Sequence, residues 1–406
     1  MRFLQSTSVL VGTILPFLSA FPTYRPNENA IIPDKYVVTF KEGTTDAEMH
    51  AHTAWVSSVQ RRNLAAGFTT AEAPGVEGMY NINTFNAYSG SFDRETIKEI
   101  KSHPNVKSVE PDRIVYVAGL VEQTDAPFGM KRISHRSLPI TDGYWYDDKA
   151  GEGSFVYVMD TGINKAHNDF EGRAIPGVNL HPDSAFDDST GHGTHCAGIA
   201  VSKTYGVAKK ATVVDVKVFN RASGAWSLLI SGLDWSVKNI TGEGRLARSS
   251  VSISISGATY GPMNEAVKAA VDAGVVVVAA AGNDGRDASR NSPGNAPEAI
   301  CVGSINSRRN TDTRSRFSNY GSTVDIFAIG EGVLSTARNT RTGTANMSGT
   351  SMATPHIAGL VGYLQSIHNL PNPAAARRML LQLASTGTIA DGRGSPNRLG
   401  YNGSGK

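Results

Sequence analysis

Apolar and polar residues alternate in blocks along most of the chain. After residue 125, apolar runs predict strands at residues 155–159, 213–219, 251–255, 275–280, 299–305 and 324–328. Between and after them, wider apolar spacing predicts helices at residues 194–201, 227–239, 262–273, 351–367 and 374–384. Continuous apolar runs are typical of strands that are buried on both faces. The pattern therefore predicts an α/β domain with a mostly parallel sheet.

A smaller unit is predicted before this domain, between about residues 21 and 120. Strands are predicted at residues 35–40, twice within 79–92 and at 106–117, and helices at 45–60 and 93–102. In the first helix, Ala47, Ala51 and Trp55 are spaced to form one face. The order βαββαβ predicts a ferredoxin-like α+β module. Residues 120–125 are polar and turn-like, which predicts a linker.

The two ends of the chain have their own patterns. Arg2 precedes an apolar run that closes on Leu18 and small residues, as in a secretory signal peptide over residues 1–20. This run is too short to span a bilayer, and no later run is long enough. We therefore expect a secreted, extracellular protein with no place in a membrane. Residues 402–406 are expected to be frayed.

Composition excludes some functions. The chain has 406 residues, of which 40% are hydrophobic and 18% charged, as in ordinary globular proteins. Its net charge is only +3, and no basic run with interleaved aromatic residues occurs, so nucleic-acid binding has no support.

Cys196 and Cys301 could form one disulfide in an oxidising compartment. We expect both to be free, because Cys196 lies within a motif that already constrains its surroundings.

The sequence GTSMATPHIAG at residues 349–359 predicts a serine at the start of an apolar helix. Pro355 is tolerated near such a start, where its missing N–H costs nothing. Ser351 would have free backbone N–H groups and the positive end of the helix dipole beside it. A developing oxyanion needs such donors. Because serines also cap helices, this motif alone leaves both a nucleophile and a cap open.

Two further stretches contain candidate chemistry. Asp160 ends a predicted buried strand, where catalytic groups of α/β sheets lie, although Asp there also caps turns. Residues 190–198, TGHGTHCAG, place His192 between two glycines. A dinucleotide loop would need the spacing G-x-G-x-x-G, which is not met. A metal site of His192, His195 and Cys196 would not have a usual zinc spacing. The third interpretation is a catalytic histidine at His192.

In this chain order, the motifs DTG, GHGTHCAG and GTSMATPH around Asp160, His192 and Ser351 resemble those of the subtilisin family of serine proteases. The cysteine within the histidine motif and the sequence FSNYG at residues 317–321 are most similar to the proteinase K branch, especially its secreted fungal members. The resemblance covers nearly the whole chain, because the N-terminal module is similar to the inhibitory propeptide of that family. It implies a subtilisin-like three-layer α/β/α domain after a ferredoxin-like propeptide.

The resemblance also implies residue roles. Ser351 would attack the peptide carbonyl, while His192 would take its proton and pass it to the leaving amine. Asp160 would hold the imidazole and stabilise its charged form. The Ser351 N–H and the Asn283 side chain would bind the oxyanion. No cofactor is expected for catalysis.

A protease of this kind is expected to be a monomeric zymogen that acts on proteins and peptides. Residues 21–120 would be its propeptide and own inhibitor, and residues 121–406 its catalytic domain. Residues 114–117 would lie in the cleft until self-cleavage between Val117 and Val121. A catalytically silent peptide-binding homologue is disfavoured because all the catalytic residue types are in place. A processing protease of limited specificity is disfavoured because no extra domain follows the catalytic one.

Substrate is expected to bind by strand addition, in which an extended peptide pairs with exposed backbone edges. By resemblance, these edges contain Ser254, Ile255, Ser256, Gly257, Gly224 and Trp226. Ser256 stands where the family usually has glycine, beside the pocket for the residue before the cleaved bond. Neither segment contains an acidic cluster, so we expect an apolar or aromatic residue at that position.

The resemblance further implies a structural calcium site. Asp325 would be its carboxylate ligand, together with backbone carbonyls near Pro297 and Ile300. Such hard oxygen donors suit Ca²⁺. Cys301 matches a position that is disulfide-bonded in proteinase K, but no cysteine follows it in this chain.

Three Asn-x-Ser/Thr sequences mark candidate N-glycosylation sites, at Asn239, Asn346 and Asn402. Asn239 ends a predicted helix in a polar stretch, which makes it the best candidate. Asn346 lies just before the Ser351 motif, where a glycan would crowd the cleft. We therefore expect glycans at Asn239 and Asn402 and not at Asn346.

Overall fold

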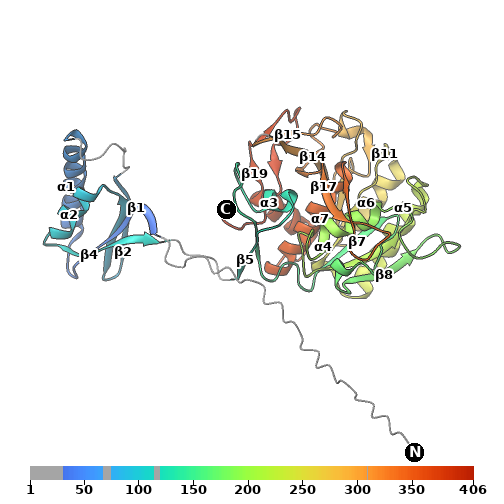
Figure 1. Cartoon of the computed structure of the whole chain (residues 1–406), viewed down its shortest axis with the longest axis horizontal. Coiled ribbons are helices and arrows are strands. Elements are labelled where there is room, and N and C mark those ends of the chain that lie inside the picture. The colour runs from blue at the N-terminus through green and yellow to red at the C-terminus, as the bar shows by residue number, and fades with distance from the viewer. Residues whose placement is uncertain (1–30, 67–74, 114–118, 309) are drawn as a thin grey trace, which may run out of the picture. The chain divides into compact units, whose positions relative to one another are not determined.

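The computed structural model describes residues 31–66, 75–113, 119–308 and 310–406 (Figure 1). The chain divides into two compact units, Met1–Ala118 and Gly119–Lys406. The predicted signal peptide and the predicted product-like segment before the cleavage region both lie outside the described residues. Within the described part, no helix is both long and apolar enough to cross a membrane.

The N-terminal unit is one antiparallel sheet with two helices. Its elements are β1 (Ile31–Phe40), α1 (Asp46–Ala65), β2 (Gly75–Ile82), β3 (Phe85–Ser91), α2 (Arg94–Ser102) and β4 (Val106–Arg113). The strand order is β2-β3-β1-β4, and all neighbours are antiparallel. This is the predicted ferredoxin-like arrangement. Asp93 accepts from the backbone N–H groups of Glu95 and Thr96, which fixes the start of α2.

Helix α1 turns a different face to the sheet from the one predicted. Met49 and Val56 are 3% and 0% exposed, whereas Ala47 and Ala51 are exposed and Trp55 is only partly buried. The prediction of an alanine face was therefore wrong. The larger apolar side chains remove more area from water when they are buried, so they decide which face packs.

The C-terminal unit is built on one large sheet, in which β8-β9-β7-β10-β12-β14-β16 are parallel neighbours. Their bounds are β7 (Phe155–Asp160), β8 (Ala174–Asn179), β9 (Thr212–Lys217), β10 (Ser249–Ile253), β12 (Val276–Ala280), β14 (Ile300–Arg308) and β16 (Ile326–Ile329). Shorter strands extend it, namely β15 (Thr311–Arg314), β19 (Ser385–Thr386), β20 (Ile389–Ala390) and β21 (Arg398–Leu399). Small pairs outside it are β5 (Leu120–Gln123) with β6 (Tyr144–Asp147), β11 (Gly257–Ala258) with β13 (Asn291–Ser292), and β17 (Val333–Thr336) with β18 (Thr344–Met347).

Helices cover both faces of this sheet. They are α3 (Phe128–Ile133), α4 (His192–Val201), α5 (Trp226–Gly242), α6 (Gly261–Asp272), α7 (Thr350–Ile367) and α8 (Pro373–Leu383). Along β7, Val156 and Val158 belong to the core that includes α4 and α7, whereas Tyr157 and Met159 belong to the core that includes α5 and α6. Alternate residues of a strand point to opposite faces. The predicted three-layer α/β/α architecture is thereby confirmed.

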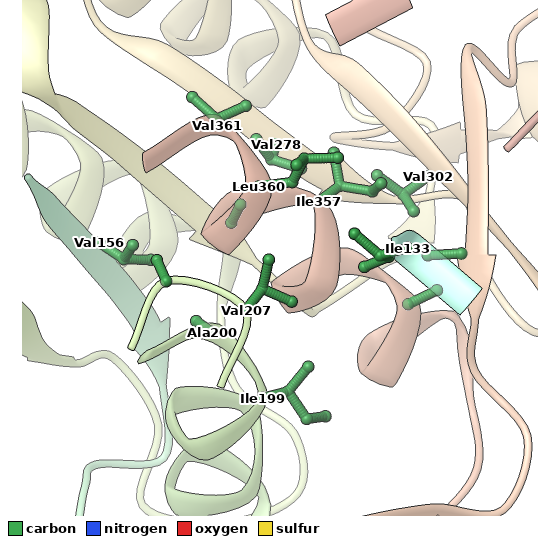
Figure 2. Close-up of a cluster of buried hydrophobic side chains, with 14 of the residues drawn as sticks. Ile133, Val156, Ile199, Ala200, Val207, Val278, Val302, Ile357, Leu360 and Val361 are labelled. Carbon is green, nitrogen blue, oxygen red and sulfur yellow. The ribbon is translucent and has the colours of Figure 1, made fainter. Parts of the chain in front are cut away.

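Helices α4 and α7 pack closely in the larger core. Figure 2 shows Ile199 and Ala200 of α4 in the same buried cluster as Ile357 and Leu360 of α7. A Cβ atom placed on Gly359 would lie only 2.6 Å from the carbonyl oxygen of Ala200. Since real Cβ atoms do not approach so closely, only glycine allows this spacing. The contact joins the last turn of α4 to the middle of α7.

Two stretches that were predicted to be irregular are held in place by hydrogen bonds to distant parts of the chain. The predicted linker contains β5, which forms an antiparallel ladder with β6. At the C-terminus, the Ser404 hydroxyl donates to the carbonyl of Ser134 at 2.6 Å, and the carbonyl of Lys406 accepts from the backbone of Arg136 at 3.0 Å. Both predictions were wrong, because short polar stretches can be held by partners that are distant in the sequence.

Candidate active site

Asp160 and His192 form a paired carboxylate and imidazole at the carboxyl end of the sheet. Asp160 is the last residue of β7 and is 1% exposed, and His192 is the first residue of α4. Nδ1 of His192 lies 2.8 and 2.9 Å from the two carboxylate oxygens of Asp160. Burial acts to lower the pKa of His192, but the Asp160 charge and the Cys196 thiol together raise it well above its ordinary value.

A second buried carboxylate, Asp188, holds this pair in place. Its Oδ1 accepts from the Thr161 hydroxyl at 2.8 Å and from the Gly191 N–H at 2.9 Å. Its Oδ2 accepts from both the N–H and the hydroxyl of Thr194, at 2.8 and 2.6 Å. Burial raises the pKa of Asp188, but these hydrogen bonds outweigh it and leave the pKa below its usual range. Asp188 was not predicted from the sequence, although it lies just before the His192 motif.

Ser351 lies in the first turn of α7, as predicted. Its hydroxyl donates to the carbonyl of Ser254 at 2.9 Å. The Sγ atom of Cys196 lies 3.4 Å from the Ser351 carbonyl oxygen and 3.9 Å from Nδ1 of His192, so the serine and the histidine are near neighbours. No hydrogen bond joins the Ser351 hydroxyl to His192 in the described residues. Such bonds often form only when substrate is bound, and here the hydroxyl must first rotate away from Ser254.

Asn283 follows β12 and faces the start of α7. Its Oδ1 accepts from the N–H and the hydroxyl of Thr350 at 2.8 and 3.0 Å, which turns Nδ2 to the other side. A Cβ atom placed on Gly349 would lie 3.6 Å from Nδ2 of Asn283 and 3.5 Å from the backbone N of Ser351. One open position therefore lies within 3.6 Å of both nitrogen atoms, and glycine leaves it free. This geometry fits a pair of oxyanion donors.

His195 takes no part in this constellation. Its Nε2 lies 3.0 Å from one carbonyl oxygen in β17 and 3.0 Å from one in β18. Burial lowers the pKa of His195 to about 4, so the ring is neutral and ties this hairpin to α4. His195 therefore does not join His192 and Cys196 in a metal site, the interpretation that their spacing already disfavoured. Among the described residues, Asp160, His192 and Cys196 have potential metal-ligand atoms within 4.8 Å of one another.

Cys196 and Cys301 are both free and buried, as predicted.

Comparisons with known proteins agree with this geometry. The model of the family described as "Subtilase family" matches residues 151–402. The chain belongs to the subtilase family. A second model, described as "Peptidase inhibitor I9", matches residues 35–118 of this subtilase, which cover most of the described part of its N-terminal unit.

Relatives of this subtilase match it over nearly its whole length. A subtilisin-like protease of Coccidioides posadasii (strain C735) is 71% identical over 407 residues and covers 100% of both chains. The subtilisin-like protease 2 of Trichophyton verrucosum is 45% identical over 403 residues and covers 96% of each chain. A solved structure, that of a cold adapted subtilisin-like serine proteinase, is 39% identical with a TM-score of 0.64, and it covers 69% of this chain and 99% of its own. The subtilase is accordingly a serine endopeptidase with a subtilisin-like fold.

One predicted substrate edge of the subtilase lies beside Ser351, whose hydroxyl donates to the carbonyl of Ser254. After β10 the chain leaves the sheet, and the backbone groups of Ile255 and Ser256 make no hydrogen bond within the described residues. The same holds for the backbone of Gly224 on the other edge. A Cβ atom on Gly224 would lie 2.3 Å from the ring of Phe219, so this edge needs glycine. Both segments can pair with an extended peptide.

Two of the predicted edge residues differ from expectation. Gly257 pairs with Ser292 in the short ladder of β11 with β13. Trp226 is the first residue of helix α5, and its ring lies beside the edge that contains Gly257. This ring stacks on Tyr260, with centroids 5.7 Å apart and planes 10° apart. It also lies 2.7 Å from the position of a Cβ atom on Gly257, so it bridges the two edges.

The predicted calcium ligands contact an arginine instead. Arg377 of α8 donates to Oδ1 of Asp325 at 2.5 Å and to the carbonyl oxygens of Pro297 and Ala299 at 2.8 and 3.3 Å. The second carbonyl is that of Ala299 and not that of Ile300. Because the guanidinium already uses these oxygens, the residues do not fit a calcium ion.

The three glycosylation sequences differ in burial. Asn402 is 2% exposed and donates its amide to the carbonyl of Trp145 at 2.7 Å, so the prediction of a glycan there was wrong. Asn239 is half-buried, and its Oδ1 accepts from the hydroxyl of Tyr157 at 2.7 Å. Asn346, which was set aside, is exposed. A sequence of this type marks an acceptor but does not reveal whether the fold covers it.

Proposed function

We propose that this subtilase is a secreted endopeptidase, made as a self-processing zymogen, that cuts proteins and peptides after apolar or aromatic residues. One observation carries the proposal: a catalytic pair, a serine, two oxyanion donors and an unpaired backbone edge meet beyond the ends of β7, β10 and β12. The residues concerned are Asp160, His192, Ser351, Asn283 and the unpaired segment 255–256. Catalytic groups of parallel α/β sheets gather at this edge.

The proposed reaction uses only these residues. Because Asp160 holds Nδ1 of His192, Nε2 is left to take the proton of the Ser351 hydroxyl. The Oγ atom then bonds to the peptide carbonyl carbon, and the oxygen gains its negative charge between the Ser351 N–H and Asn283. His192 gives the proton to the leaving amine, which breaks the C–N bond. Water then repeats the cycle on the acyl-enzyme and frees Ser351.

Replacing Asn283 with alanine is expected to lower kcat with little change in KM, because this amide contacts the oxygen mainly after it becomes charged. The loss known for the equivalent asparagine of subtilisin is about 10²–10³-fold, and we expect the same order here. Initial rates on a short peptide substrate measure it. Asn346→Ala serves as the control, since that exposed asparagine contacts neither Ser351 nor His192. An Asn283→Ala enzyme with the kcat of the wild type would remove this side chain from the mechanism.

The proposed preference rests on the charges and rings beside the two edges. Asp284, the carboxylate next to Asn283, accepts from Asn291 at 3.1 Å and lies 3.3 Å from Arg286, so it is not free for a basic substrate side chain. The Trp226 ring adds apolar surface between the edges. Apolar and aromatic side chains gain most from such a surface.

A library of peptides that differ in the residue before the cleaved bond tests this preference. We expect the wild type to cut mainly after apolar and aromatic residues. In the Ser256→Gly enzyme, removal of the side chain beside the pocket should shift the ratio of kcat/KM values further towards the largest aromatic residues. Cleavage mainly after Lys or Arg would contradict the proposed specificity without affecting the proposed mechanism.

The other parts of the proposal concern export and control. Residues 1–20 would direct secretion, so a chain that lacks residues 2–20 should stay inside the producing cells. The I9-type unit would inhibit the mature monomer until it is degraded. A glycan at Asn239 stays a prediction, for which the mass of the secreted protein before and after deglycosylation is the check.

A further inference from the structure

A single arginine joins three separate parts of the catalytic unit. Arg377 lies on α8, Asp325 directly precedes β16, and the loop through Pro297 and Ala299 leads into β14. Nη2 of Arg377 lies 2.5 Å from Oδ1 of Asp325. Nη1 lies 2.8 Å from the carbonyl oxygen of Pro297 and 3.3 Å from that of Ala299. The guanidinium therefore has a carboxylate and two carbonyl oxygens around it.

Asp325 needs this positive charge. Its side chain is 13% exposed, and its second oxygen accepts from the backbone N–H of Cys301 at 2.9 Å. Burial raises the pKa of Asp325, while the charge of Arg377 acts to lower it. Without Arg377, the buried carboxylate between β14 and β16 would lose its ion-pair partner, which is costly.

These oxygens are of the type that binds calcium. A carboxylate and backbone carbonyls are hard donors, and Ca²⁺ takes six to eight such oxygens, often including water. The side chain of Arg377 is 32% exposed, so its removal would let solvent reach the remaining three oxygens. A guanidinium, in contrast, fills the position with a planar set of donors that cannot dissociate from the chain.

We propose that the guanidinium of Arg377 is a built-in substitute for a calcium ion, and that this position binds Ca²⁺ once the arginine is shortened. The native enzyme then needs no calcium to hold the 297–299 loop against Asp325. A chelator cannot remove its cation. The same three oxygens form a latent calcium site in the Arg377→Ala protein.

Thermal unfolding of the mature enzyme in EDTA and in millimolar CaCl₂ tests this inference. The variants are Arg377→Ala, Arg377→Ala with Asp325→Asn, and Arg378→Ala as the matched control. Arg378 is the next residue of α8 and is exposed, so its loss removes the same charge without opening the site. Any calcium that binds elsewhere contributes equally to all these proteins.

We expect the Arg377→Ala enzyme to unfold several degrees lower than the wild type in EDTA and to recover in CaCl₂. Its calcium-dependent shift should exceed that of the wild type and of Arg378→Ala, and calorimetric titration should show one additional bound Ca²⁺. The added Asp325→Asn change should abolish both gains. An Arg377→Ala enzyme whose calcium response equals that of the wild type would overturn the inference.

A second measurement decides the question if the Arg377→Ala protein does not accumulate. In the enzyme that retains Arg377, the change Asp325→Asn should leave the calcium response as it is, because no ion binds to Asp325. Loss of the wild-type calcium response in this variant would mean that an ion displaces the arginine, and the inference would be wrong.

Discussion

Changing Ser351 to alanine is expected to lower kcat by about 10⁶-fold, the order of the loss known for the nucleophile of subtilisin itself. The reason is that Oγ is the only atom of this site proposed to bond to the substrate. The fold should not change, because Cys196 and Ser254 donate to the backbone oxygen of Ser351, which alanine retains.

The same variant should fail to process itself. The precursor of the Ser351→Ala protein is expected to keep its I9-type unit, so its mass should exceed that of the wild-type product. Ser348→Ala is the matched control, since this exposed serine only accepts a hydrogen bond from the backbone of Gly332. A Ser351→Ala protein that still loses its N-terminal unit when produced alone would show that another protease makes the cut.

Replacing Asp160 with asparagine is expected to have the second largest effect, a loss of kcat of about 10⁴-fold. The carboxylate contacts Nδ1 of His192 through both oxygens, so it fixes the tautomer in which Nε2 is free to accept a proton. An amide in its place can present an N–H group to Nδ1 and stabilise the wrong tautomer. The positive charge that forms on the imidazole would also lose its counter-charge.

The pH dependence should change together with the rate. His192 acts as a base only when it is neutral, and the charge of Asp160 raises its pKa well above the ordinary value of 6.5. The acidic limb of the wild-type profile of kcat/KM should therefore lie above pH 6.5. In Asp160→Asn the raising charge is lost while burial still lowers the pKa, so the limb should move to lower pH. An acidic limb that does not move in Asp160→Asn would mean that the limb reflects the titration of another group.

Most regular elements could be predicted because their patterns are local. The continuous apolar runs of β7 and β12 identified strands buried on both faces, and the structure confirms them. Strand β8 was missed because Pro176 and Gly177 interrupt its pattern. A register shift between Pro176 and Val178 shows how the strand tolerates them at the edge of the sheet.

The residues of the candidate site could be predicted where a short sequence motif determines the local backbone. The two glycines beside His192 and the helix start at Ser351 are visible in the sequence. The ion-pair partner of Asp325 could not be predicted, because Arg377 is 52 residues away and no local pattern links the two residues. Burial was equally hidden at Asn402, whose amide bonds to a residue 257 positions earlier. Contacts of this kind follow from packing, which the fold alone reveals.

The most direct test of the central claim uses a fluorophosphonate probe, which reacts covalently with an activated serine. The secreted wild-type product and the Ser351→Ala protein are treated in parallel and analysed by mass spectrometry. The account predicts that the wild type has lost its N-terminal unit and carries one label on Ser351, and that the variant carries none. A wild-type protein that is secreted and fully processed yet unlabelled would mean that Ser351 is not activated, and a peptide-binding role would replace the catalytic one.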